Sequence, residues 1–246
     1  MQEPPRLHPG NALFLDFDGT LVDIAETPEA IEVPPALVGL LGDLHDWLDG
    51  AIAVVSGRQI DVLDRFLAPL RLCAAGEHGV QRRDPNGEMR EQPAPDLACV
   101  LDAANQLAGA HAGLLVERKH AAVALHYRLA PELEALCRDQ MQRAIDGDPR
   151  FELLHGKSVF EVKPAGINKG IAIDAFMQEA PFIGRTPVFA GDDTTDESGF
   201  AVVQPAGGVA IKVGSGPSLA QHRLDSPRAV FEWLAQPRGP RAAANA

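Results

Sequence analysis

The chain has 246 residues, of which 46% are hydrophobic and 23% are charged, a composition typical of a soluble globular protein with a substantial core. Its formal net charge of -12 repels phosphate-rich polymers and anionic membrane surfaces, so neither nucleic acid nor a membrane is an expected partner. Three widely spaced cysteines, and the lack of a visible export signal or of an apolar run approaching roughly 20 residues, predict a reduced, cytoplasmic protein.

Short apolar runs predict the strands of a buried sheet. They lie in residues 11–17, 51–57, 186–191 and 208–213. Helical periodicity fills much of the sequence between them, as in the segment from Pro35, where leucines recur at three- and four-residue steps. This alternation predicts an α/β fold with a mostly parallel sheet covered on both faces.

The middle third of the sequence predicts a separate unit. A hairpin is expected to turn at residues 85–87, and a proline-containing linker follows it. Two helical stretches and several strand-like segments then fit a smaller α+β insert of about 70 residues. We expect a discontinuous core domain over residues 1–93 and 164–246, with the insert at 94–163. The tail, 237–246, lacks apolar anchors and is expected to be disordered.

The first acidic motif closes the first predicted strand. Asp16 and Asp18 lie two residues apart there, so both carboxyl groups can face one pocket, and Gly19 lets the backbone turn tightly past a ligand. Paired carboxylates repel each other unless a cation or a shared proton lies between them, and Mg²⁺ suits a site that also binds phosphate. A solvated acidic strand end is the competing interpretation of this motif taken alone.

A second acidic cluster follows the predicted strand at residues 186–191. Its members are Asp192, Asp193, Asp196 and Glu197. Carboxylates gathered where a buried strand emerges are costly unless a cation is bound. An acidic helix N-terminus is the competing explanation, and it accounts for Glu197 or Asp196 better than for Asp192.

Two polar segments between the acidic motifs can bind phosphate oxygens. Ser56, Gly57 and Arg58 end the second predicted strand, and Lys169 begins a helix. A hydroxyl group and a compact lysine charge both suit phosphate oxygens. Each residue alone is more often a capping or surface residue, so the indication comes from their combination and order.

Together these motifs resemble those of the haloacid dehalogenase superfamily of phosphatases. The matching features are DFDGT, Ser56 after a hydrophobic strand, Lys169 and GDDTTDE. More closely, nearly all of residues 11–236 is similar to trehalose-6-phosphate phosphatases, through VVSGR, GEHG, ERK, HYR, GKSVFEVKP and INKG. The resemblance implies a Rossmann-like core of the haloacid dehalogenase type with an inserted α+β cap of the larger, C2 type.

The resemblance also implies a Mg²⁺-dependent phosphomonoesterase that acts through a covalent aspartyl-phosphate. Asp16 would be the nucleophile, and Asp18 would protonate the departing sugar oxygen and then deprotonate the attacking water. Ser56 and Lys169 would bind the transferring phosphoryl group. The implied Mg²⁺ ligands are the Asp16 side chain, the Asp18 backbone carbonyl and Asp192, with Asp193 or Asp196 in support.

Alternating polar residues in the insert predict a sugar-binding face. His126 and Arg128 share one side of a predicted strand, as Glu117 and Lys119 do in the preceding segment. A plain solvent-facing strand is the competing interpretation. By the resemblance, the residues that grip the distal glucose are Glu117, Lys119, Lys157 and Glu161. Those implied to line the phosphate end of the cleft are Arg58, His78 and Arg128.

The leading hypothesis is hydrolysis of trehalose 6-phosphate to trehalose and phosphate in trehalose biosynthesis, by a monomer whose partner is this small disaccharide phosphate. A phosphatase for another sugar phosphate, such as that of sucrose or mannosylglycerate, or one of broad range stays open as an alternative. A phosphomutase is disfavoured because nothing indicates a second phosphate site in the insert. A catalytically silent binding module is disfavoured because Asp16, Asp18, Lys169 and Asp192 are all present.

Overall fold

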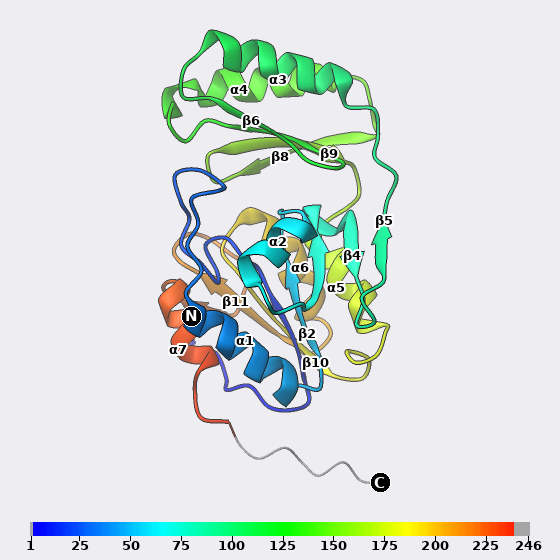
Figure 1. The fold of residues 1–246 in the computed structure, drawn as a ribbon, viewed down its shortest axis with the longest axis vertical. Coiled ribbons are helices and arrows are strands. Elements are labelled where there is room, and N and C mark those ends of the chain that lie inside the picture. The colour runs from blue at the N-terminus through cyan, green and yellow to red at the C-terminus, as the bar shows by residue number, and fades with distance from the viewer. Residues whose placement is uncertain (1, 239–246) are drawn as a thin grey trace. The chain divides into compact units, whose positions relative to one another are not determined.

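The computed structural model of the chain describes residues 2–238. Over these residues the chain divides into two compact units (Figure 1). Within the described residues, the core unit comprises residues 2–90 and 168–238, and the inserted unit comprises Glu91–Ile167. The insert expected from the sequence, residues 94–163, is shorter at both ends than this inserted unit.

The core unit is built on a mostly parallel sheet. Its strands are β1 (Asn11–Leu15), β2 (Ile52–Val55), β3 (Cys73–Gly76), β4 (Gln81–Arg83), β5 (Met89–Glu91), β10 (Thr186–Gly191), β11 (Val209–Val213) and β12 (His222–Leu224). They follow the order β12-β11-β10-β1-β2-β3-β4-β5. The pairings from β12 to β3 are parallel, whereas β4 runs antiparallel to β3. The predicted α/β sheet is confirmed.

Helices cover the core sheet and explain why its central strands are apolar along their whole length. They are α1 (Pro35–Trp47), α2 (Ile60–Leu67), α5 (Lys169–Met177), α6 (Glu197–Val203) and α7 (Pro227–Leu234), with short 3-10 turns η1 (Glu77–Gly79) and η3 (Thr194–Asp196). Every residue of β1 and β2 is buried, as expected for strands packed on both faces. The leucine stripe predicted from Pro35 onward is buried in α1.

The inserted unit packs an antiparallel sheet against two helices. The strands are β6 (Leu115–Arg118), β7 (Val123–His126), β8 (Phe151–Gly156) and β9 (Val159–Pro164), and the helical elements are α3 (Ala98–Ala110), η2 (Pro131–Leu133) and α4 (Glu134–Ala144). Figure 1 shows α3 and α4 on one side of this sheet, whose strand order is β6-β7-β9-β8. Apolar residues of β7 and β9 pack with the helices in a core of their own. The predicted α+β character of the insert is confirmed.

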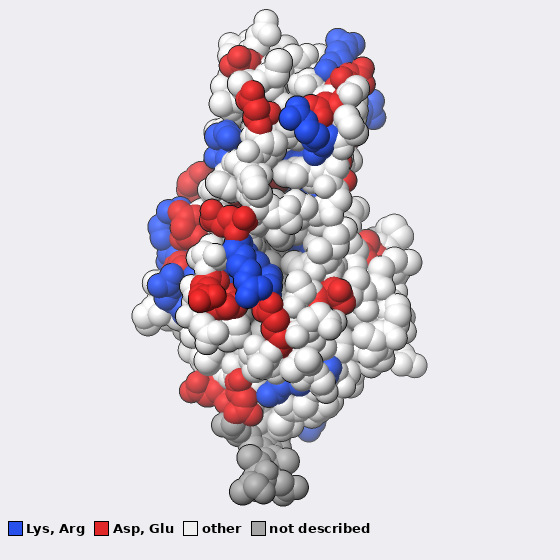
Figure 2. Space-filling view, turned by 90° about the vertical axis from the view of Figure 1, so that its right-hand side faces the viewer, with Lys and Arg blue, Asp and Glu red and all other residues white. Residues whose placement is uncertain are grey.

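The visible surface of the molecule fits the mixed charges of the composition. Figure 2 shows acidic and basic side chains interspersed over the visible face, without a large region of basic residues. Among residues 2–238, none of the helices combines the length and apolarity that crossing a bilayer requires. The disorder expected for residues 237–246 concerns a segment that, from residue 239 onward, lies outside the described residues.

Candidate active site of the core unit

The pairing of β1 with β10 brings the two acidic motifs together. Leu15 is the register partner of Ala190, and the Asp16 amide donates a hydrogen bond of 3.0 Å to the Ala190 carbonyl just beyond the end of β1. Asp192 follows the last residue of β10 in the same way. Because parallel strands end at the same edge of a sheet, the Asp16 and Asp192 carboxyl groups meet there although they are far apart in sequence.

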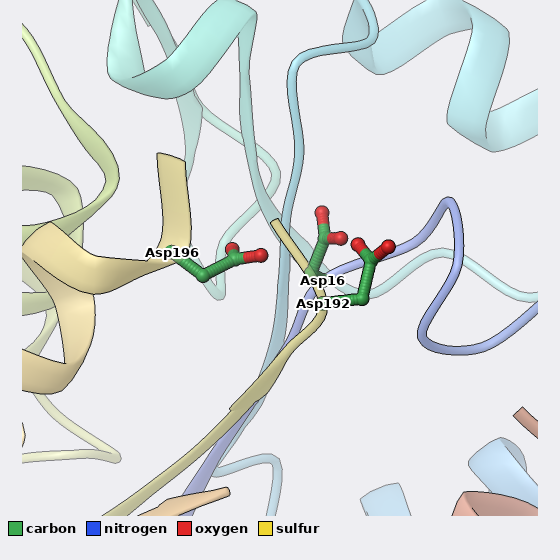
Figure 3. Close-up of side chains that lie close together, drawn as sticks. All are labelled: Asp16, Asp192 and Asp196. Atoms are coloured by element: carbon green, nitrogen blue, oxygen red, sulfur yellow. The ribbon is translucent and has the colours of Figure 1, made fainter. Parts of the chain in front are cut away.

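Three buried carboxyl groups form the centre of the site. Asp16, Asp192 and Asp196 each offer one oxygen, and these oxygens all lie within 4.8 Å of one another. In Figure 3 the Asp16 and Asp192 carboxyl groups lie side by side, and that of Asp196 points toward them. The exposed fractions are 4% for Asp16, 4% for Asp192 and 0% for Asp196. Carboxylates so deeply buried repel one another strongly unless a cation lies among them.

Glycines make room for two of these carboxyl groups. Gly19 has a φ of +77°, and a Cβ atom at that position would lie 2.1 Å from Asp192 Oδ2. A Cβ atom on Gly191 would lie 2.2 Å from Asp196 Cγ. Any larger residue at either position must therefore displace an aspartate of the cluster.

The side chain of Lys169 places a positive charge within the carboxylate cluster. It begins α5 after Asn168, whose side chain caps the helix by accepting from the Ile171 amide. The buried Nζ atom donates to Asp16 Oδ1 at 2.6 Å and to Asp196 Oδ1 at 2.7 Å. Burial disfavours the charged ammonium, but the two carboxylates outweigh it and raise the Lys169 pKa above its ordinary value.

The charges of the cluster do not balance within the chain. Burial, followed by the nearby Asp196 carboxylate, raises the pKa of Asp16 well above its ordinary range, even though Lys169 acts in the opposite direction. With one ammonium among three carboxylates, the fully ionised cluster carries a formal charge of -2. A divalent cation would neutralise that charge, and a set of carboxylate oxygens suits Mg²⁺.

Two acidic residues of the second motif, Asp193 and Asp196, also organise the start of η3. Asp193 caps η3, where its Oδ1 accepts from the Thr194 amide at 2.6 Å. Asp196 Oδ2 in turn accepts from the Asp193 amide at 2.9 Å. Both Asp196 oxygens accept hydrogen bonds, one from Lys169 and the other from the Asp193 amide, so this carboxylate is held on both sides. The alternative of an acidic helix start thus applies to Asp196, as expected, and also to Asp193, because the two residues form a capping box at η3.

Asp18 lies beside the cluster and is paired with Arg58. Arg58 Nε donates to Asp18 Oδ2 at 2.7 Å, and Arg58 Nη2 donates to Asp18 Oδ1 at 2.8 Å. Ser56 is buried at the end of β2, where its Oγ accepts from the Arg58 amide at 3.2 Å. The polar segment that ends β2 and the first acidic motif therefore belong to one site.

His78 also belongs to this site, and the backbone that positions it has an unusual conformation. Glu77 and His78 adopt left-handed conformations with φ of +46° and +60°, and the His78 amide donates to the Ser56 carbonyl at 2.9 Å. A Cβ atom on Gly57 would lie 2.8 Å from the His78 ring, so only glycine allows the ring to pack there. Successive left-handed residues outside glycine are rare and are typical of functional sites.

One residue of the core site was missed by the sequence analysis. Lys212 is buried in β11, and its Nζ donates to the Asp192 backbone carbonyl, which fixes the residue that follows β10. The signal available in the sequence was a lysine inside an apolar run that is otherwise typical of a buried strand.

In the inserted unit, the face of the sheet opposite the helices carries two polar pairs. Glu117 and Glu161 are both register partners of Ala124, on β6 and β9, so they share that face. Lys119 Nζ donates to Glu161 Oε2 at 2.6 Å, with both side chains buried. Glu117 Oε2 lies 2.9 Å from His126 Nε2. Burial acts against ionisation of Glu117, but the contact with His126 and the charge of Lys119 lower its pKa.

The other two residues assigned to the insert meet at the turn between β8 and β9. Arg128 Nη2 donates to the Lys157 carbonyl at 3.0 Å. Lys157 is exposed, and its neighbour Ser158 accepts a hydrogen bond from the Tyr127 amide at 3.0 Å. The structure thus gathers the insert residues into one polar group on β6, β7 and β9 and a second at this turn.

Comparison with known proteins agrees with this geometry. The sequence model described as Trehalose-phosphatase matches residues 14–229. This chain belongs to the trehalose-phosphatase family. A relative within it, the trehalose-6-phosphate phosphatase of Escherichia coli K12, is 45% identical over 237 residues, which cover 95% of this chain and 89% of that protein.

Solved structures agree with membership of the trehalose-phosphatase family. A trehalose-6-phosphate phosphatase related protein superposes with a TM-score of 0.72 at 28% identity, over 90% of this chain and 94% of that one. A haloacid dehalogenase-like hydrolase from B. subtilis superposes with a TM-score of 0.64 at 14% identity, over 92% and 99% of the two chains, and so shares the fold. The expected Rossmann-like core of the haloacid dehalogenase type is therefore confirmed.

Proposed function

We propose that this chain hydrolyses trehalose 6-phosphate to trehalose and phosphate in trehalose biosynthesis. Family membership and the 45% identity with the Escherichia coli enzyme support this substrate. The structural observation that carries the proposal is the buried cluster of Asp16, Asp192 and Asp196 around Lys169. Burying such a cluster costs free energy of folding because its charges lose their hydration. The cluster supplies the nucleophile and the charges that phosphoryl transfer requires.

Asp16 is the proposed nucleophile. Its Oδ1 is held by Lys169 at 2.6 Å, whereas Oδ2 has only a long contact of 3.4 Å from the Thr20 hydroxyl. We assign the attack on phosphorus to Oδ2 because it is the less engaged oxygen. A bond forms between this oxygen and phosphorus as the bond from phosphorus to the sugar oxygen breaks.

Asp18 is the proposed proton carrier. It gives a proton to the departing sugar oxygen, and in the second step it accepts a proton from the water that attacks the aspartyl-phosphate. That attack releases phosphate and regenerates the Asp16 carboxylate. Ser56 and Lys169 are proposed to bind the phosphoryl oxygens. Gly57 and His78 are proposed to line the same phosphoryl-binding site.

Magnesium is the proposed cofactor, and the residues present fit it. The proposed ligands are the Asp16 side chain, the Asp18 backbone carbonyl and Asp192, with Asp193 and Asp196 in support. When bound, Mg²⁺ supplies positive charge that offsets the phosphoryl oxygens and the clustered carboxylates. Lys212 holds the backbone of Asp192, which keeps one of these ligands in place.

The inserted unit, residues 94–163 in the sequence-based division, is proposed to act as a cap that selects the disaccharide. Its paired polar side chains are suited to sugar hydroxyl groups because each pair can donate and accept hydrogen bonds. The proposed contacts to the distal glucose are Glu117, Lys119, Lys157 and Glu161, with Arg128 nearer the phosphate. We further propose a cytoplasmic monomer that binds neither nucleic acid nor membranes, in keeping with its net charge of -12.

A phosphate-release panel tests this function. The purified chain is offered trehalose 6-phosphate, sucrose 6-phosphate, mannosylglycerate phosphate and glucose 6-phosphate, each with Mg²⁺ and with a chelator. We expect the highest kcat/KM on trehalose 6-phosphate and loss of activity without Mg²⁺. Equal kcat/KM on glucose 6-phosphate would contradict selection of a disaccharide, and preference for another disaccharide phosphate would support the alternative phosphatase.

A further inference from the structure

The Arg58 guanidinium engages both oxygens of the Asp18 carboxylate. The two donor-acceptor distances, 2.7 and 2.8 Å, describe a two-pronged ion pair. Such a pair fixes the plane of the carboxylate as well as its position. A single-point contact, such as a lysine makes, would leave that plane free to rotate.

Arg58 is held in place independently of Asp18. Its Nη1 donates to the Pro28 carbonyl at 2.9 Å, and its guanidinium carbon lies 5.8 Å from the Phe17 ring centroid and 5.2 Å from that of Phe66. Its side chain is 13% exposed, compared with 33% for Asp18. The arginine is therefore anchored by contacts other than Asp18 and can hold the aspartate in turn.

The backbone around Arg58 is also restrained on both sides. Its amide donates to Ser56 Oγ, and its carbonyl accepts from the Glu77 amide at 2.9 Å. A Cβ atom on Gly76 would lie 2.8 Å from that carbonyl oxygen, so the close approach depends on glycine. These restraints aim the guanidinium at the first acidic motif rather than out to solvent.

We propose that Arg58 is a positioning residue for proton transfer by Asp18, rather than a residue that binds the phosphoryl group directly. This inference rests on the proposed function. In the first step the proton leaves Asp18 for the sugar oxygen while Asp16 gains its bond to phosphorus. Arg58 holds the plane of the Asp18 carboxyl group, so that this group is oriented toward the sugar oxygen in the first step and toward the attacking water in the second.

The nature of the leaving group separates this role from phosphate binding. A sugar alkoxide is a poor leaving group that needs the proton from Asp18, whereas p-nitrophenolate leaves without one. The kcat/KM value reports the steps up to formation of the aspartyl-phosphate, because that step releases the leaving group. Loss of the positioning residue should therefore lower kcat/KM on trehalose 6-phosphate much more than kcat/KM on p-nitrophenyl phosphate.

The test measures the ratio of these two kcat/KM values in the full chain with Mg²⁺. For Arg58→Met we expect the ratio to fall roughly 10- to 100-fold, which is part of the roughly 10²- to 10⁴-fold that general acid–base catalysis usually contributes. The ratio is insensitive to the folded fraction of a variant, because misfolded protein lowers both values equally. An equal fall on both substrates, or no fall on either, would overturn the proposal.

Three further variants sharpen the result. Asp18→Asn should lower the ratio in the same way, and the double variant should fall no further, since the two residues act as one unit. Arg58→Lys keeps the charge but cannot bind both oxygens, so a wild-type ratio there would overturn the orienting role. Arg65→Met removes an exposed arginine that pairs with Asp61 on α2, and its ratio should match the wild type.

The proposal and the proposed function fail in different ways. If the wild-type chain prefers another sugar phosphate, the substrate assignment fails, yet the same ratio can be measured with the preferred sugar phosphate. If trehalose 6-phosphate is confirmed and the ratio is unchanged in Arg58→Met, the positioning role alone is wrong.

Discussion

The Nζ atom of Lys169 lies 2.6 Å from Asp16 Oδ1, although the two residues are 153 positions apart in the sequence. The same atom lies 2.7 Å from Asp196 Oδ1. One buried ammonium thus links the end of β1, the start of α5 and the turn after β10. Both the stability and the activity of the core unit should therefore depend on Lys169.

Lys169→Met should destabilise the chain as well as inactivate it. The substitution leaves Asp16 and Asp196 buried without their counter-charge, and breaking a buried ion pair from one side costs about 3–5 kcal/mol. Urea unfolding of the two proteins without Mg²⁺ measures the difference. Lys157→Met, at an exposed lysine, is the matched control and should lose much less stability than Lys169→Met. A loss below about 1 kcal/mol for Lys169→Met would contradict the reasoning.

Asp16→Asn should abolish turnover while the fold is kept. The amide has nearly the shape of the carboxyl group but cannot form the aspartyl-phosphate, so kcat should fall roughly 10³-fold or more. Phosphate release measures the rate, and circular dichroism checks the fold. Trapping of labelled phosphate on the wild-type chain but not on the variant would support the covalent step. A variant with the wild-type rate would remove that step from the mechanism.

Gly19→Ala should impair the site beyond its effect on the backbone. Alanine at φ +77° costs about 1–2 kcal/mol in any left-handed position, and here its Cβ atom would also displace Asp192. Gly184→Ala is the matched control, because Gly184 has φ +78° with no atom within 4 Å of the added Cβ. We expect Gly19→Ala to lose at least as much stability as Gly184→Ala in thermal unfolding, because only alanine at position 19 meets a buried side chain. Only Gly19→Ala should need a higher Mg²⁺ concentration for half-maximal activity, and equal Mg²⁺ dependence would argue against the clash.

A surface cluster in the core unit should make stability sensitive to acid. Glu179 accepts hydrogen bonds of 2.8 and 2.9 Å from Arg82 and one of 2.9 Å from Arg90. The Arg82 hydrogen bonds lower the pKa of Glu179 from 4.5 to about 2. Because the folded-state pKa is depressed, the stabilisation is complete above the unfolded value and is lost as pH falls toward the folded value.

The variant Glu179→Gln tests this pH dependence. Its free energy of unfolding should be lower than that of the wild type at neutral pH, and the difference should shrink as pH falls from about 4.5 to about 2. Urea unfolding across this range measures it. Glu232→Gln, at an exposed residue of α7 paired with Arg228, is the control and should show a smaller pH-dependent difference. A difference that stays constant with pH would contradict the assigned cause.

Local features of the sequence were enough to predict the elements. The leucine spacing from Pro35 predicted α1, and the apolar runs that end before Asp16 and Asp192 predicted β1 and β10. These predictions succeeded because helix and strand periodicities are properties of neighbouring residues. The same motifs carried the resemblance to the phosphatase family, since the chemistry fixes residue types at the strand ends.

Only the tertiary structure shows which residues that are far apart in the sequence contact each other. The pairing of β1 with β10 brings Asp192 to Asp16, and the packing of α5 beside η3 brings Lys169 to Asp196. The pairing of Arg58 with Asp18 likewise depends on β2 lying next to β1. Strand order and side-chain pairing depend on how distant segments pack, and no local periodicity encodes them. The sequence therefore determined which residues could perform the chemistry, and the fold determined which of them meet.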